Sequence, residues 1–129
     1  PHMKAAGLGA IVNVSSTAGI FGSGSSIAYA MSKAALNTLT IALARALAPE
    51  VRVNAVCPGF VQGRWHLQNL DAAEYEAHVR EWQERSPLRK AATPEEVAGV
   101  VTGLITGPDL MTGQIVVCDA GANMGGRRR

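Results

Sequence analysis

Two short aliphatic runs separated by a long helical stretch most constrain what this chain can fold into. Residues 10–14 are almost entirely apolar without alternating polar positions, which is typical of a parallel strand buried on both faces. A second, valine-rich run covers 51–56, and Pro58 and Gly59 follow it. Between the two runs, 28–47 repeats leucine at intervals of three and four, which predicts a helix. Because parallel strands need a long crossover, this order predicts an α/β fold.

The rest of the chain continues this alternation. Thr93 and Glu96 flank Pro94 in a capping-box pattern, which predicts a helix start. The remaining expected elements are a glycine- and serine-rich loop over 17–26, a helix over 71–85, a helix from Thr93 to about 106 and a strand over 114–118. The sequence therefore predicts one domain with about three parallel strands and crossover helices.

The composition excludes several classes of protein. With 47% hydrophobic and 17% charged residues, the chain is too apolar for a disordered protein. Three of its twelve basic residues lie in the tail 127–129, and the other nine face ten acidic residues, so the body of the chain is close to neutral. We therefore expect no nucleic-acid partner. The histidines lack ligand-like spacing, so we expect no metal site.

The cysteines and the hydropathy pattern indicate a compartment. Cys57 and Cys118 lie far apart without a CxxC pattern, so we expect two buried thiols in a reducing environment. We find no signal peptide and no apolar run near the roughly 18 residues of a membrane span. These features predict a cytoplasmic, soluble protein with no membrane partner.

Tyr29 and Lys33 form a candidate catalytic pair. They are four residues apart in the predicted helix, so their side chains lie on one face, one turn apart. An ammonium group beside a phenol favours the ionised phenol, which can act as a general acid or base. Ser16 follows the first strand and could hydrogen-bond the same substrate oxygen. Taken alone, the Tyr-x-x-x-Lys pair is weak, because such pairs arise often by chance and an ordinary contact on a helix surface explains them better.

The wider pattern resembles the classical short-chain dehydrogenase/reductase family. Ser16 precedes Tyr29 by thirteen positions, which is the spacing of the serine and tyrosine in that family. The other matching segments are Ile11–Val14, Gly19, Gly22, Val53-Asn54, Pro58-Gly59, Arg89, Pro94–Ala98 and Thr112–Gln114. Because these matches extend through essentially the whole chain, together they are more specific than any single motif.

The resemblance implies the C-terminal part of a Rossmann-type parallel sheet, with the N-terminal nucleotide-binding half of the family absent. Residues 1–129 would form one partial catalytic domain. Ser16 would orient the substrate oxygen, and Tyr29 would exchange a proton with it. Lys33 would favour the ionised tyrosine and, together with Tyr29, hold the nicotinamide ribose of NAD or NADP.

The resemblance also implies a cofactor wall and a substrate lid. Pro58, Gly59 and the backbone at Val61 would lie against the nicotinamide, and 63–86 would form the lid. Candidate pocket walls in or near this lid are Trp65, His66, Leu67 and Trp82. For the tryptophans, plain packing of the lid helix is at least as compatible with the sequence.

Two functions remain open at this point. One is an oxidoreductase that transfers hydride between NAD(P)(H) and an alcohol or ketone. The other is a non-enzymatic, dehydrogenase-like fragment that serves as an oligomerisation or structural module.

The sequence departs from the family pattern at several places. The family's glycine-rich turn has no counterpart here, Gly63 replaces a common threonine, and Asp119-Ala120-Gly121 replaces Asp-Gly-Gly. An unpaired edge on the first strand would invite another chain, so we expect a homo-oligomer.

Overall fold

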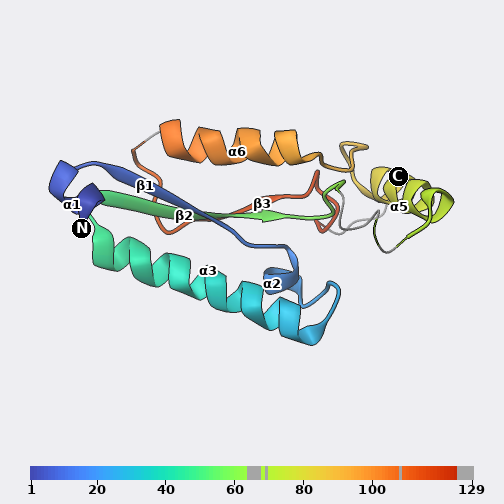
Figure 1. Ribbon diagram of the computed structural model, residues 1–129, viewed down its shortest axis with the longest axis horizontal. Helices are drawn as coiled ribbons and strands as arrows, with labels where there is room; N and C mark the ends of the chain where they lie inside the picture. The colour runs from blue at the N-terminus through green and yellow to red at the C-terminus, as the bar shows by residue number, and fades with distance from the viewer. Residues whose placement is uncertain (64–67, 69, 108, 125–129) are drawn as a thin grey trace.

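The expected strands form one parallel sheet, shown in the computed structural model of Figure 1. The structure describes residues 1–63, 68, 70–107 and 109–124. The strands are β1 (Gly9–Val14), β2 (Val51–Pro58) and β3 (Ile115–Cys118), in the order β1-β2-β3. This arrangement confirms the α/β fold and places β2 in the centre, with β1 at one edge.

Helices cover both faces of this sheet (Figure 1). One face packs against α3 (Ile27–Leu47), and the other contacts α6 (Pro94–Thr106). Near the end where the strands finish lie α2 (Ala18–Phe21) and α5 (Ala72–Arg85), whereas α1 (His2–Ala6) lies at the opposite end. The carboxyl ends of the strands therefore meet loops and helix ends, which is where open parallel sheets bind ligands.

The core lies along the central strand. Four of its side chains have no exposed surface, namely those of Val53, Ala55, Val56 and Cys57. β1 differs from the expectation of a strand buried on both faces, because its residues are only half-buried and Val14 is 51% exposed. The physical reason is its position, since an edge strand has a neighbouring strand on one side only. The homo-oligomer expected from this edge stays a prediction.

A short helix, α2, lies inside the segment 17–26 that was expected to be a loop. The carbonyl of Thr17 accepts hydrogen bonds from the amides of Ile20 and Phe21 at 3.0 and 2.9 Å. Gly22 then ends the turn in the left-handed conformation, with φ 67°. A single turn is too short to show a helical period, which explains why the sequence pattern does not predict it.

The central strand also continues further than expected, through Pro58 instead of ending at residue 56. The carbonyl of Pro58 accepts a hydrogen bond from the amide of Thr17 at 3.0 Å, and Pro58 pairs with Cys118. A proline at the end of a strand loses only its own N–H donor, so the ladder tolerates it there. This extension brings the segment after β1 beside the end of β2.

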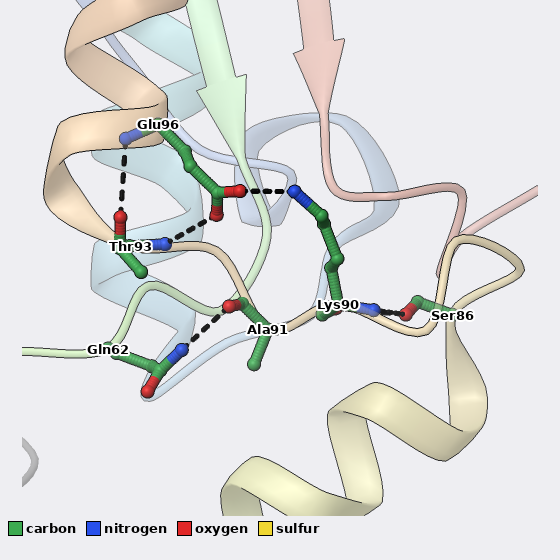
Figure 2. A network of polar contacts seen from close by, with 6 residues as sticks. All are labelled: Gln62, Ser86, Lys90, Ala91, Thr93 and Glu96. Carbon is green, nitrogen blue, oxygen red and sulfur yellow. Dashed lines mark hydrogen bonds and ion pairs between the residues drawn. The ribbon is translucent and has the colours of Figure 1, made fainter.

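The start of α6 is part of a polar network that Figure 2 shows. Thr93 and Glu96 form the expected capping box, in which each side chain accepts from the other residue's amide. Lys90 forms an ion pair with Glu96, and this contact holds the pKa of the glutamate below its usual range. The amide of Lys90 donates to the hydroxyl of Ser86, which in turn donates to the carbonyl of Lys90. The side chain of Gln62 donates to the carbonyl of Ala91. The network thus joins the end of α5, the start of α6 and the segment after β2.

One helix is long and apolar enough to span a membrane, although the sequence pattern predicted no such segment. By length and composition alone, α3 is apolar enough to cross a membrane. In this fold it instead packs against β2, with Asn37, Thr40 and Ala44 buried on that side. Mostly buried core helices of soluble proteins pass the same test, so one such helix is only weak evidence of a membrane span.

Ala120 adopts the left-handed backbone conformation, with φ 56°, at the position that the resemblance assigns to glycine. This conformation costs a residue with a Cβ about 1 kcal/mol. We therefore expect Ala120→Gly to raise the melting temperature by about 4 °C in a thermal unfolding scan. Ala122 has no positive φ, so Ala122→Gly is the matched control and should not stabilise. Equal effects of the two substitutions would contradict the assignment of strain to Ala120.

Candidate active site

A cavity of about 980 Å³ opens at the carboxyl ends of the strands. It is bounded by the loop after β1, the first turns of α3, the end of β2 and one face of α5. All the site residues expected from the sequence line it, namely Ser16, Tyr29, Lys33, Pro58, Gly59 and Val61. The structure therefore brings these six residues together, although they come from three separate segments of the chain.

Ser16 lies in a tightly held turn after β1. The amide of Ser15 continues the ladder by donating to the carbonyl of Val56 at 2.8 Å. The Oγ of Ser16 accepts a hydrogen bond from the amide of Ala18 at 3.1 Å, and the residue is only 9% exposed. With an acceptor position of Ser16 occupied by the backbone, its hydroxyl hydrogen is left as the group to offer to a ligand.

Tyr29 and Lys33 lie on one face of α3, as their spacing predicts. Ser26 caps this helix, because its Oγ accepts from the amide of Tyr29 at 3.1 Å. The Nζ of Lys33 lies 5.6 Å from the centroid of the Tyr29 ring and donates to the carbonyl of Val14 at 3.0 Å. The end of β1 therefore holds the ammonium group beside the phenol.

Gly19 permits the close approach of α2 to α3. A Cβ at this position would lie 2.5 Å from the carbonyl carbon of Lys33 and 2.6 Å from the next amide nitrogen. The side chain of Ser15 adds a hydrogen bond to the same turn, from its Oγ to the carbonyl of Lys33 at 3.1 Å. The backbone that carries Lys33 is thus pressed directly against the segment that carries Ser16.

Sequence reasoning missed Asn37, which connects three elements behind the cavity. Its Nδ2 reaches the carbonyl of Gly19 at 3.5 Å, and its Oδ1 accepts from the thiol of Cys57 at 3.6 Å. Asn37 is buried and lies four residues after Lys33, so it continues the same helix face. That spacing is the signal by which the sequence could have identified it.

The two cysteines differ in burial, and the expectation that both are buried is wrong for one of them. Cys57 is buried, whereas Cys118 is only partly covered, and both thiols are free. Burial raises the pKa of both thiols. Cys118 pairs with Pro58 in the ladder and Cys57 with Val117, so the two side chains point to opposite faces of the sheet.

The end of β2 forms a wall without a side chain at Gly59. A Cβ on Gly59 would lie 2.9 Å from the Cβ of Asp119 and 3.3 Å from the ring of Trp82. Val61 forms an isolated parallel bridge with Ala92, which holds the wall in place. The space beside Gly59 is therefore already filled by Asp119 and Trp82, so only glycine fits at this point of the wall.

On its far side the cavity is lined by α5. Trp82, which the sequence proposed as a pocket wall, does line it. The other proposed walls, Trp65, His66 and Leu67, lie outside the described residues. Arg85 also lines the cavity, and neither it nor its neighbour Asn123 was identified from the sequence.

Comparisons with known proteins identify relatives of this chain. The family model described as enoyl-(acyl carrier protein) reductase matches residues 1–123. The short-chain dehydrogenase/reductase homolog YusR of Bacillus subtilis is 44% identical over 124 residues, which is 96% of this chain and 91% of that protein. The 3-oxoacyl-(acyl-carrier-protein) reductase FabG of Thermotoga maritima is 37% identical over 123 residues, which is 94% of this chain and 48% of FabG.

Solved structures share the fold of this chain. The crystal structure of a gluconate 5-dehydrogenase from Burkholderia cenocepacia, in complex with NADP and tartrate, has a TM-score of 0.82 at 25% identity. The match covers 96% of this chain and 48% of that one. The chain thus spans about half the length of this dehydrogenase and of FabG, but most of YusR.

Proposed function

Because the chain belongs to the short-chain dehydrogenase/reductase family, we propose that it forms the catalytic half of an oxidoreductase. The reaction is hydride transfer between NAD or NADP and an alcohol or ketone. The observation that carries this proposal is the convergence of Ser16, Tyr29 and Lys33 on one cavity at the carboxyl ends of the strands.

Ser16 positions the substrate oxygen. Its Oγ already accepts a hydrogen bond from the amide of Ala18, so its own hydrogen points to the remaining partner, the oxygen of a bound ketone or alcohol. Its low exposure keeps competing water away from this hydroxyl. The hydrogen bond it donates stabilises negative charge on that oxygen as the carbonyl is reduced.

Tyr29 moves the proton. In reduction, its phenol gives a proton to the oxygen of the substrate, and in oxidation the phenolate takes that proton back. The ammonium of Lys33, 5.6 Å from the ring, stabilises the negative charge that the phenol oxygen carries in between. Tyr29 is 37% exposed, so its hydroxyl is accessible to a ligand in the cavity.

The residues present fit a nicotinamide ring and its ribose. The wall at Pro58, Gly59 and Val61 lines the same cavity as Tyr29 and Lys33, and packing against Asp119 leaves room only for glycine at its centre. Lys33 donates one of its three N–H groups to the carbonyl of Val14, which leaves two to donate to ribose hydroxyls. When bound, the nicotinamide supplies or accepts the hydride.

A cofactor titration tests the proposal. The contacts proposed here involve only the nicotinamide and its ribose, so NADPH, NADH and reduced nicotinamide mononucleotide should bind this chain with similar, weak affinity. Lys33→Ala should weaken all three by about tenfold, because it removes a charged hydrogen-bond donor. Nicotinamide fluorescence measures each dissociation constant.

Lys4→Ala is the matched control, because Lys4 lies in α1 at the opposite end of the sheet. It should leave all three affinities unchanged. If none of the three ligands binds, or if Lys4→Ala and Lys33→Ala have equal effects, the proposed cofactor wall is wrong.

A further inference from the structure

The face of α5 that lines the cavity carries the cationic side chain of Arg85, which takes no part in the proposed proton transfer. Trp82 and Arg85 lie three residues apart, so both point to this side of the helix. The Cζ of Arg85 lies 4.8 Å from the centroid of the Trp82 ring, which is the geometry of a cation–π contact. The guanidinium group therefore rests on an aromatic base at the cavity wall.

That aromatic base is itself fixed. The ring of Phe60 stacks on Trp82 with centroids 5.9 Å apart and an angle of 18° between the planes. Phe60 is 7% exposed and lies directly after the wall formed by the end of β2. The packing thus ties α5 to the sheet and limits the positions that Arg85 can take.

A second contact orients the guanidinium group. Its Nη2 donates to the Oδ1 of Asn123 at 3.2 Å. Asp119 in turn holds Asn123, because one of its carboxylate oxygens accepts from both the amide and the Nδ2 of Asn123 at 2.9 Å. This pair of bonds turns the Nδ2 of Asn123 toward Asp119 and leaves its Oδ1 facing Arg85.

The charge of Arg85 is not neutralised within the described part of the chain. Its hydrogen-bond partner there, Asn123, is neutral, and no carboxylate lies within ion-pair distance. Glu81 on the same face pairs with the Nδ1 of His78 at 3.7 Å. Asp119 does not pair with Arg85, because its carboxylate accepts hydrogen bonds from the amides of Gly121 and Asn123 in its own loop. A guanidinium group has five N–H donors, so most of its capacity remains for a ligand.

We propose that Arg85 binds a carboxylate group of the substrate, so that the enzyme acts on a keto or hydroxy acid. This inference rests on the proposed function, because the reacting oxygen would lie at Tyr29 and Ser16 in the same cavity. The planar fork of arginine matches the two oxygens of a carboxylate. One guanidinium beside Glu81 suits a monoanion better than a phosphate dianion.

The test compares ligands that differ only in charge. The dissociation constants of 4-oxopentanoate and its methyl ester are measured by NMR titration, without cofactor and without turnover. The chain should bind the acid about tenfold more tightly than the ester, as expected for a charge-assisted hydrogen bond. Arg85→Gln should abolish this preference while leaving the affinity for the ester unchanged.

Arg80→Gln is the matched control, because Arg80 lies on α5 outside the cavity and pairs with Glu76. It should preserve the preference. The inference is overturned if the acid and the ester bind equally, if neither binds, or if the preference persists in Arg85→Gln. Tighter binding of dihydroxyacetone phosphate than of 4-oxopentanoate would also overturn the assignment to a carboxylate. None of these readouts needs hydride transfer, so they fail independently of the proposed reaction.

Discussion

Replacement of Tyr29 with phenylalanine is expected to lower kcat for ketone reduction by about 10³-fold. The substitution removes only the hydroxyl that exchanges a proton with the substrate. The ring remains available for the ammonium of Lys33, which lies 5.6 Å from its centroid. Because the side chain is 37% exposed, the loss of its hydroxyl should leave the fold intact. The effect should therefore fall on catalysis and not on stability.

The measurement is a kcat with saturating NADPH and ketone, on a form of the protein that binds the cofactor. Tyr75→Phe is the matched control, because Tyr75 is on α5 and does not line the cavity. It should retain wild-type kcat, and both variants should unfold at the wild-type temperature. A Tyr29→Phe enzyme within about threefold of wild type, far less than general acid–base catalysis contributes, would refute the role of the phenol.

Gly19→Ala should destabilise the fold by about 3 kcal/mol. A Cβ at Gly19 would lie 2.5 Å from the backbone of Lys33, and a backbone atom in the middle of a helix cannot move aside as the end of a side chain can. To relieve the overlap, α2 must separate from α3. That separation would also move Gly19 away from Asn37, whose side chain reaches its carbonyl.

Urea unfolding measures this change in the free energy of unfolding. Gly103→Ala is the matched control, because Gly103 is inside α6 and a Cβ there would meet nothing within 4 Å. That substitution should instead stabilise the protein by about 0.5–1 kcal/mol, since alanine loses less backbone entropy in a helix. If the Gly19 variant were as stable as wild type, the close packing of α2 on α3 would be wrong.

The fold also explains why residues predicted from their spacing in the sequence lie together in one site. Ser16, Tyr29 and Lys33 were identified by spacing, and the structure brings them into one cavity with Pro58, Gly59 and Val61. Their chemical roles remain predictions until the titration and the Tyr29→Phe measurement are made. Their convergence follows from the topology, because parallel strands deliver their ends to one edge of the sheet.

The sequence by itself determined those features that depend on neighbouring residues. The order of the three strands and of α3, α5 and α6, the capping box at Thr93 and the helix face shared by Tyr29 and Lys33 all follow from local patterns, and the structure confirms each of them. Local patterns suffice here because hydrophobic period, capping and i,i+4 spacing act within a few residues.

Only the tertiary structure decided the rest. The single turn of α2, the exposed edge of β1 and the contact of Gly19 with Lys33 depend on what packs nearby. The same holds for Arg85, whose partner Asn123 is 38 residues away in the sequence. No spacing rule relates residues so far apart, because their meeting requires the sheet and α5 to be in place first.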